Sequence, residues 1–333
     1  MVDIFDRLEK NAGGPIGQYM SAVHGYFAFP KLEGEIGPHM RFRGKMMLNW
    51  SLNNYLGLAN HPEVRQADAA GAAEFGMAAP MGARMMSGQT KYHEQLEREL
   101  AEFVGKEDAV TYSTGMQVNL GVVSCLSTRG SYVLLDSLDH ASIIDGSRLG
   151  FGKVLKFRHN DVRHLEKRLK QCEPDSFKLI VIDGIYSMEG DIAPLHEICD
   201  LCDKYNASVM VDDAHSLGVL GRNGRGTADY FGETDRVDLI MGTFSKSFGS
   251  LSRLLALSLS SSQIFLSIKP KRSAENLRLI PGAMFAAIIA PSIRIGPEPH
   301  MGSMKSLSPR QPVSNIMPAA STSFMGAAPV STL

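Results

Sequence analysis

The middle of the chain is a succession of short apolar runs, each separated from the next by a segment with helical spacing of its apolar residues. Apolar runs that do not alternate with polar residues are typical of strands covered on both faces. Strands that alternate with helices in this way form a mostly parallel sheet with helices on both faces. The sequence therefore predicts an α/β fold over about residues 50–250. The expected strands are 110–112, 132–136, 154–157, 179–183, 208–212 and 239–241, and the expected helices are 61–75, 92–104, 161–169 and 194–205, with two more beginning near 113–115 and 140.

The residues before this domain have a different pattern. Residues 1–25 have the spacing of an amphipathic helical arm, and residues 40–50 alternate enough for a short hairpin. A loop rich in Gly and Met is expected at 80–88, between the first two helices. We therefore expect an N-terminal arm with a hairpin at 1–50 and a folded domain at 51–250.

The composition changes near residue 250. Residues 251–333 contain 9 of the 16 prolines, 15 serines and no tyrosine, with 8 Lys and Arg against 2 acidic residues. Segments with this composition bury too little apolar surface to offset the entropy of ordering the chain. We expect residues 251–333 to form a divergent tail that is poorly packed or disordered.

Polar residues follow the expected strands at the edge where an open α/β sheet binds its ligands. Ser113-Thr114-Gly115 enters a helix and could hold a phosphate on free backbone N–H groups, although such residues are common in any turn from a strand to a helix. His140 lies near a helix start, where a structural role is the more usual one. Asp212 ends a buried strand and needs a cationic partner, and Lys246 follows another strand, where burial can make its amine nucleophilic.

These groups need one ligand with a phosphate, a protonatable ring nitrogen and a carbonyl group. Pyridoxal phosphate has all three. The carboxylate would keep the ring nitrogen protonated, and the lysine would hold the aldehyde. The sequence therefore predicts pyridoxal phosphate as the cofactor.

Five motifs in this order resemble those of the α-oxoamine synthases, which are fold-type I pyridoxal-phosphate enzymes of the class II aminotransferase kind. The motifs are Asn53-Asn54-Tyr55-Leu56-Gly57-Leu58, Ser87-Gly88 before Tyr92-His93-Glu94-Gln95-Leu96-Glu97, Asp139-His140-Ala141-Ser142, Val211-Asp212-Asp213-Ala214-His215 and Thr243-Phe244-Ser245-Lys246. The resemblance covers about residues 40–250. It implies a fold-type I transferase fold and a homodimer.

The resemblance also implies roles for individual residues. Lys246 matches the Schiff-base lysine, Asp212 the partner of the ring nitrogen, His215 the residue that hydrogen-bonds the phenolic oxygen and His140 the residue that stacks on the ring. The remaining matches are Gly115 and Met116 at the phosphate turn, Ser187 and Thr243 at further cofactor contacts, and Asn54 near the substrate.

Family members condense a small amino acid with an acyl-CoA and release CoA and, in most members, CO₂. Residues 80–90 are most similar to bacterial serine palmitoyltransferases, which implies serine and palmitoyl-CoA as substrates and a role in sphingoid-base biosynthesis. Aminoketobutyrate CoA ligase, aminooxononanoate synthase and aminolevulinate synthase share the other motifs and stay open as alternatives.

The family pattern ends after Leu251. We therefore expect the C-terminal small domain of the family, with the arginine that binds the substrate carboxylate, to be missing or degenerate here. We hypothesise a reading-frame shift near codon 251. A truncated, non-catalytic homologue is therefore a second reading of the chain, beside an active enzyme.

Composition excludes several other classes of protein. The net charge of −1 argues against a nucleic-acid binder, and no apolar run is long enough for a transmembrane segment. The start lacks the features of a secretory signal, and four cysteines do not make a disulfide framework, so we expect a cytoplasmic protein. Cys199 and Cys202 are interpreted as helix packing residues, and no metal site is expected.

Overall fold

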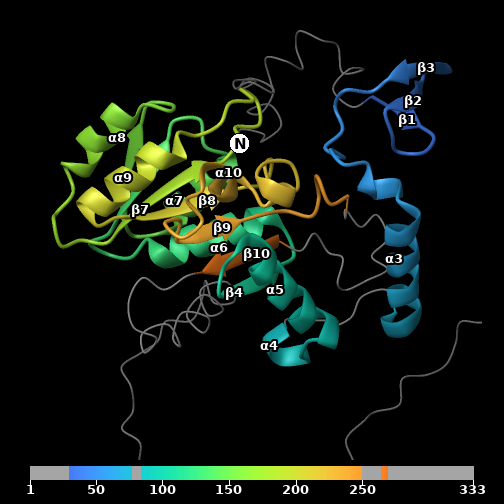
Figure 1. Cartoon of the computed structure of the whole chain (residues 1–333), viewed down its shortest axis with the longest axis horizontal. Coiled ribbons are helices and arrows are strands. Elements are labelled where there is room, and N and C mark those ends of the chain that lie inside the picture. Colours follow the sequence, from blue (N-terminus) through green and yellow to red (C-terminus); the bar gives the residue numbers. More distant parts are fainter. Residues whose placement is uncertain (1–29, 77–83, 250–263, 269–333) are drawn as a thin grey trace, which may run out of the picture. The chain divides into compact units, whose positions relative to one another are not determined.

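A twisted seven-stranded sheet forms the centre of the computed structural model, which describes residues 30–76, 84–249 and 264–268 (Figure 1). Within these residues the strand order is β4-β10-β9-β8-β7-β5-β6. The pairs β5–β6, β5–β7, β7–β8 and β8–β9 are parallel, and β10 runs antiparallel to both β4 and β9. The prediction of a mostly parallel sheet is confirmed. The strands are β4 (Asp108–Tyr112), β5 (Tyr132–Asp136), β6 (Lys153–Phe157), β7 (Lys178–Asp183), β8 (Ser208–Asp212), β9 (Leu239–Met241) and β10 (Ile264–Ile268).

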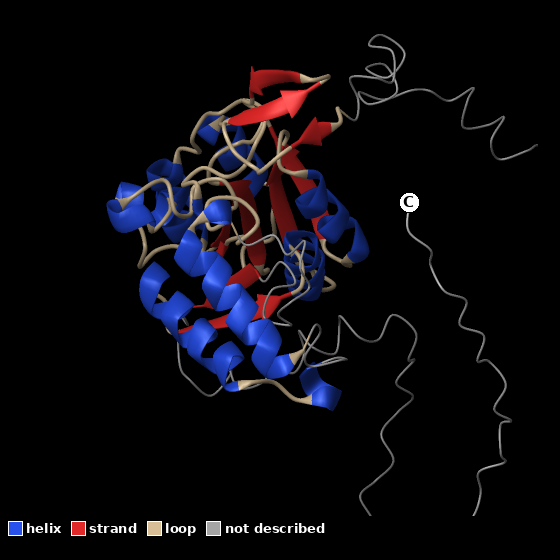
Figure 2. Cartoon of the chain, turned by 90° about the vertical axis from the view of Figure 1, so that its right-hand side faces the viewer, coloured by secondary structure: helices blue, strands red, loops and turns tan. Residues whose placement is uncertain are grey.

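Helices cover both faces of the sheet, as the sequence predicts (Figure 2). Successive residues of β7 point to opposite faces, so that Leu179 and Val181 join one apolar cluster while Ile180 and Ile182 join the other. The first cluster includes side chains of α6 and α7, and the second includes side chains of α5, α8 and α9. The helices are α5 (Lys91–Val104), α6 (Gly115–Leu126), α7 (Ala141–Leu149), α8 (Val162–Leu169), α9 (Leu195–Tyr205) and α10 (Thr227–Phe231), with a short 3₁₀ helix η2 (Arg222–Gly224) before the last.

The N-terminal part of the described chain contains a small antiparallel sheet and a helix. The hairpin expected at 40–50 is present as β2 (His39–Phe42) and β3 (Lys45–Leu48), and β1 (Leu32–Glu33) pairs with β2. Arg43 and Gly44 both have positive φ, 51° and 74°, as a two-residue hairpin turn requires. The 3₁₀ helix η1 (Leu58–Asn60) precedes α3 (Pro62–Phe75), which begins at the expected proline.

Two expectations for the N-terminal half have a different outcome. The arm predicted at 1–25 lies outside the described residues. Part of the segment expected as a loop at 80–88 is a short helix, α4 (Arg84–Ser87), because Arg84 is held by several hydrogen bonds to neighbouring elements.

One strand of the central sheet comes from the segment that the sequence analysis assigned to the tail. β10 pairs with β4 through Ile264↔Tyr112 to Ile268↔Asp108, and with β9 through Leu266↔Met241 to Ile268↔Leu239. The expectation for 251–333 was therefore wrong for these five residues. Average composition hid a short run of strand-forming residues, Ile264-Phe265-Leu266-Ser267-Ile268. The rest of that segment lies outside the described residues.

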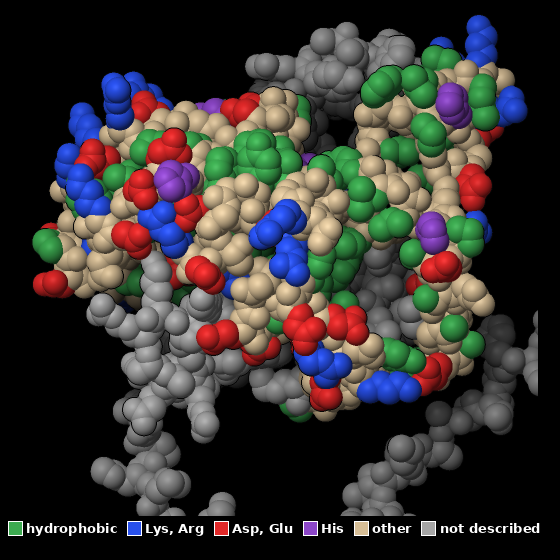
Figure 3. Space-filling model, in the orientation of Figure 1, with side chains coloured by type: hydrophobic (Ala, Val, Ile, Leu, Met, Phe, Trp, Pro, Cys, Tyr) green, Lys and Arg blue, Asp and Glu red, His purple; other side chains and the backbone are tan. Residues whose placement is uncertain are grey.

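The surface carries both signs of charge. On the face drawn in Figure 3, Lys and Arg side chains are interspersed with Asp and Glu side chains over the described residues. Among the described helices, none is both long and apolar enough to cross a membrane.

Candidate active site

The candidate site lies at the carboxyl ends of the parallel strands, and its residues end or follow β4, β5, β7, β8 and β9. Lys246 stands in the loop after β9, and two contacts fix this loop. Ser247 Oγ donates to the carbonyl oxygen of Leu217, and Gly249 N donates to the carbonyl oxygen of Lys246 at 3.0 Å. Gly249 has a φ of +65°, and a Cβ there would clash with the backbone of Ala59. Only glycine therefore lets the lysine loop approach η1 so closely.

Lys246 begins a chain of hydrogen bonds that leads out to Tyr55. Its Nζ lies 2.7 Å from His215 Nε2, and His215 Nδ1 lies 2.7 Å from the Tyr55 hydroxyl. The hydroxyl in turn donates to Asn53 Oδ1 at 3.2 Å. If the lysine ammonium donates to Nε2, the proton of a neutral imidazole must be on Nδ1, where it donates to Tyr55. This chain fixes both the tautomer and the orientation of the histidine.

Burial lowers the pKa of both Lys246 and His215. Burial lowers the pKa of Lys246, although Asp212 and Asp183 attract the ammonium and act in the opposite direction. Burial, the Lys246 charge and His140 lower the pKa of His215 to about 4. His215 is therefore neutral at physiological pH, and the amine of Lys246 is easier to deprotonate than that of an exposed lysine.

Asp212 is a buried carboxylate whose two oxygens both receive N–H donors. Asn119 Nδ2 donates to Oδ2 at 2.8 Å, and the backbone N–H of Ala214 donates to Oδ1 at 3.0 Å. Asn119 also donates to Ser142 Oγ at 2.9 Å. Donors of this kind favour the charged form of a carboxyl group. Asp212 is thus prepared to face a cationic group.

His140 is the N-cap residue of α7, and its ring is exposed. Nδ1 lies 2.7 Å from Ser142 Oγ and accepts from the Ser142 backbone N–H at 3.3 Å. The backbone N–H of His140 donates to Asp183 Oδ2 at 2.8 Å. The ring is therefore anchored at one nitrogen while its face is left open to a ligand.

The turn that could hold a phosphate enters α6. Thr114 is its N-cap residue and accepts from the Gln117 backbone N–H at 3.1 Å. Gly115 and Met116 form the first turn, where backbone N–H groups have no partner within the helix, and the Met116 side chain is 54% exposed. Thr243, in the loop after β9, is buried, and its Oγ1 lies 2.7 Å from Ser245 Oγ.

Two residues assigned by the sequence analysis do not join these contacts. Ser187 is exposed in the turn after β7. Asn54 Oδ1 accepts from the Ala59 backbone N–H at 3.1 Å and so stabilises its own turn. Neither side chain belongs to the hydrogen-bonded chain from Lys246 to Asn53.

The structure also places three residues in the site for which the sequence analysis proposed no role. These are Asn119, Tyr55 and Asp183. The sequence could have indicated a role for Asn119, because this amide stands in a helix beside the apolar residues Val118, Val122 and Val123. In the structure Asn119 is fully buried. A buried polar side chain on an apolar face needs a polar partner.

Comparisons with known proteins agree on one family. The model of the family "Aminotransferase class I and II" matches residues 45–282, which extends past residue 250. A serine palmitoyltransferase of Bacteroides thetaiotaomicron is 48% identical over 248 residues, covering 74% of this chain and 63% of the relative. A cysteate-C-fatty acyltransferase of Capnocytophaga ochracea is 46% identical over 261 residues, covering 77% of this chain and 62% of the relative. An 8-amino-7-oxononanoate synthase of Coprothermobacter proteolyticus is 46% identical over 226 residues, covering 67% of this chain and 57% of the relative.

A solved structure also matches this chain over most of its length. A variant of serine palmitoyltransferase from S. paucimobilis, with a bound PLP–myriocin aldimine, matches with a TM-score of 0.75 and 33% identity, covering 88% of this chain and 69% of that one. The chain spans 63% and 62% of the length of the first two relatives described above.

Proposed function

Because the chain belongs to the class I and II aminotransferase family, we propose that it is a pyridoxal-phosphate-dependent α-oxoamine synthase. It would condense a small amino acid, serine in the first instance, with an acyl-CoA such as palmitoyl-CoA, and so supply a sphingoid-base precursor. The observation that carries this proposal is the half-buried amine of Lys246, 2.7 Å from His215 and at the same strand ends as Asp212. The names of the relatives support the serine and palmitoyl-CoA pair.

The donors and acceptors at the site fit pyridoxal phosphate. Lys246 would hold the aldehyde carbon, Asp212 would face the ring nitrogen, and the exposed ring of His140 would lie against the cofactor ring. The first turn of α6 at Gly115 and Met116, with Thr243, would take the phosphate, and Ser187 would add a further contact. When bound, this cofactor supplies an electron sink for a carbanion at the amino acid.

The residues of the chain supply binding, orientation and proton transfer. Because the pKa of Lys246 is lowered by burial, its amine is available as a nucleophile and later as a base that removes a proton from the amino acid. His215 receives the hydrogen bond from Nζ and keeps it in line with Tyr55. Asn119 and Ala214 donate hydrogen bonds to the Asp212 carboxyl and hold it where it would meet a cationic nitrogen.

The first test is the substitution Lys246→Ala. The purified wild-type protein should show a visible absorption band from the bound cofactor and should retain the cofactor covalently after borohydride reduction. Lys246→Ala should lose both, because it removes the Nζ that would bind the aldehyde. Lys170→Ala is the matched control, since Lys170 is an exposed lysine in an ion pair with Glu166, and it should behave as wild type. Equal covalent labelling of Lys246→Ala would contradict the assignment.

The amino acid and the acyl chain need a separate test. CoA release should be measured with palmitoyl-CoA and either serine or cysteate, because relatives bearing both names match this chain. Faster release with another amino acid and acyl-CoA would favour one of the other α-oxoamine synthases, for which the 8-amino-7-oxononanoate synthase match is the specific support.

A second candidate is a non-catalytic homologue that binds the cofactor without turnover. Cofactor binding without CoA release would be its signature. We also propose a homodimer, which the sedimentation behaviour of the purified protein would test.

A further inference from the structure

Asp183 and Asp212 form a pair of buried carboxyl groups at the end of the sheet. They end the neighbouring parallel strands β7 and β8 and are direct partners in the strand register. Partners in register point to the same face of a sheet, so the two side chains share one environment. Asp183 is 6% exposed and Asp212 is 3% exposed. Two carboxylates in such a place cannot both be charged without a large cost.

The hydrogen bonds of the pair are unequal. Asp212 accepts an N–H on each oxygen, from Asn119 and from Ala214. In the described part of the chain, the hydrogen bond given to the Asp183 carboxyl comes from His140 N, at 2.8 Å to Oδ2. The carboxyl with more N–H donors is better stabilised as an anion, which places the negative charge on Asp212.

Asp183 also joins β7 to the turn that carries His140. The His140 N–H donates to the Asp183 side chain, and the Asp183 N–H donates to Asp139 Oδ1 at 3.3 Å. These two hydrogen bonds run in opposite directions between the same two segments. The ring of His140 is fixed in turn by Ser142. A change at Asp183 would therefore act directly on the backbone that positions His140.

We propose that Asp183 is a positioning residue, which holds His140 in place with a protonated, uncharged carboxyl group and leaves the negative charge of the pair on Asp212. This inference rests on the proposed function, because His140 and Asp212 are the groups assigned to the two sides of the cofactor ring.

The electrostatics of the pair agree with this assignment. Burial and the neighbouring Asp212 raise the pKa of Asp183 to about 8, and Asp136 acts in the same direction. The His140 N–H and the Lys246 ammonium act in the opposite direction. Asp139, which contacts the backbone of Asp183, also has a pKa raised well above its usual range by burial and by the acidic groups around it.

The substitution Asp183→Asn separates charge from position. An asparagine is uncharged and still offers an oxygen to the His140 N–H, whereas Asp183→Ala removes that acceptor. We therefore expect apo-protein of Asp183→Asn to bind pyridoxal phosphate within about threefold of wild type. Asp183→Ala should bind about tenfold more weakly, because one hydrogen bond to a buried N–H is lost. Asp212→Asn should also bind about tenfold more weakly or worse, because there the charge itself is needed.

Two further measurements test position and protonation directly. The visible circular dichroism of the bound cofactor, which reports its orientation, should be unchanged in Asp183→Asn and altered in Asp183→Ala. The infrared difference spectrum between wild type and Asp183→Asn at pH 7 should contain the C=O stretch of a carboxylic acid. This spectrum needs no cofactor, and it remains informative if Asp183→Ala fails to fold.

The outcomes separate the inference from the proposed function. A wild-type protein that does not bind pyridoxal phosphate overturns the proposed function and the inference with it. If wild type binds, the inference is overturned alone by any of three results. These are a carboxylate spectrum for Asp183, an Asp183→Asn variant as weak as Asp212→Asn, or a folded Asp183→Ala variant with wild-type affinity and circular dichroism.

Discussion

At the scale of single residues, His215 shows how folding selects one protonation state. In the folded chain its pKa is lowered to about 4 by burial and by the nearby Lys246 and His140, whereas an unfolded histidine titrates near 6.5. Between these values the unfolded state binds more protons than the folded state. The free energy of unfolding of the apo-protein should therefore fall as pH drops from about 6.5 towards 4, and His215 should add no slope above 6.5.

This pH dependence can be measured by urea unfolding of wild type and His215→Gln at several pH values. The variant should lose less stability on the acid side. His159→Gln is the contrasting control. Burial lowers the pKa of His159, but its hydrogen bonds with Asp191 and Asp136 outweigh this and raise it, so its stabilisation is present in acid and is lost as pH rises through the folded pKa. An acid slope in His215→Gln equal to that of wild type would contradict the prediction.

The sequence predicts individual site residues only where a motif carries them. Lys246 and His215 belong to motifs, and in the structure they contact each other. Asp183 also ends an expected strand, but its role depends on standing beside Asp212 in the register of two strands. Register between strands that are far apart in the chain is set by packing, so no local pattern could have paired these two carboxyl groups.

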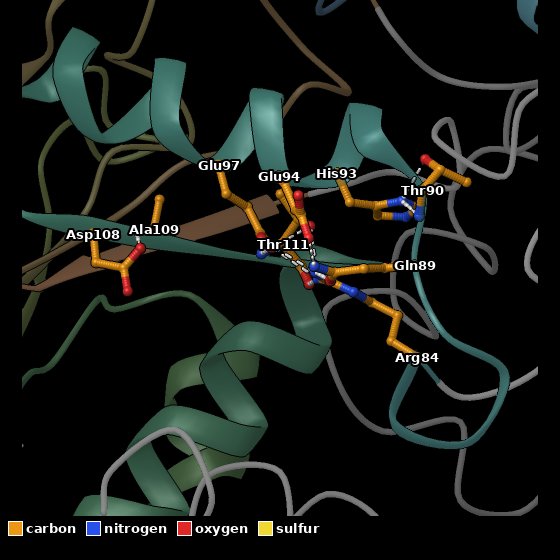
Figure 4. Close-up of polar contacts among 9 residues, drawn as sticks. All are labelled: Arg84, Gln89, Thr90, His93, Glu94, Glu97, Asp108, Ala109 and Thr111. Carbon is orange, nitrogen blue, oxygen red and sulfur yellow. Dashed lines mark hydrogen bonds and ion pairs between the residues drawn. The ribbon is translucent and has the colours of Figure 1, made fainter. Parts of the chain in front are cut away.

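At the scale of elements, a network around Arg84 covers the outer edge of β4 (Figure 4). Arg84 Nη1 lies 2.7 Å from Glu97 Oε1 and donates to Thr111 Oγ1 at 3.0 Å. Glu97 Oε1 also accepts from the Thr111 backbone N–H at 2.8 Å. An edge strand presents unpaired N–H groups, and here a side chain of α5 satisfies one of them.

Glu97→Ala should therefore be strongly destabilising. It leaves the Thr111 N–H and the Arg84 guanidinium without this partner, and the Arg84 and Glu97 side chains are only 19% and 14% exposed. We expect a loss of about 2–3 kcal/mol in the free energy of unfolding. Glu35→Ala is the matched control, because its ion pair with Arg65 is 67% and 64% exposed, and such pairs contribute about 0–1 kcal/mol. Equal losses in the two variants, measured by urea unfolding, would show that the network stabilises the fold no more than an exposed ion pair does.

A helix or strand could be predicted from the sequence where a single local pattern determined it. The helix α8 was expected at 161–169 from Asp161, whose side chain accepts the His164 N–H as an N-cap. The strands β5 and β7 contain continuous apolar runs at 132–135 and 179–182, and they were placed to within one residue. By contrast, α4 forms because Arg84 binds Glu97 and Thr111, a tertiary cause that the Gly- and Met-rich sequence does not reveal.

At the scale of the whole molecule, β10 joins two parts of the sheet that would otherwise be separate. Leu266 is in register with Val110 of β4 on one side and with Met241 of β9 on the other. β4 leads directly into the turn at Gly115 that we assign to the cofactor phosphate. The position of that turn relative to Lys246 therefore depends on a strand that lies after residue 250.

Truncation tests this dependence. A chain ending at residue 249 lacks β10, so β4 and β9 each have an unpaired edge, and such edges promote aggregation. We expect it to unfold at lower temperature, to aggregate and to bind pyridoxal phosphate poorly. A chain ending at residue 291 retains every strand of the described sheet, and it should melt and bind as the full-length protein does.

Leu266→Pro in the full-length chain is the second variant, because proline removes a backbone donor and is poorly tolerated in a central strand. It should reproduce the loss seen on truncation at 249 without removing any residue. Thermal unfolding, size-exclusion chromatography and cofactor titration of these three variants and of the full-length protein test the prediction. If Leu266→Pro and the 249-residue chain both match full-length protein, β10 contributes nothing to the sheet, and the phosphate turn must be held in place by α5 and α6 alone.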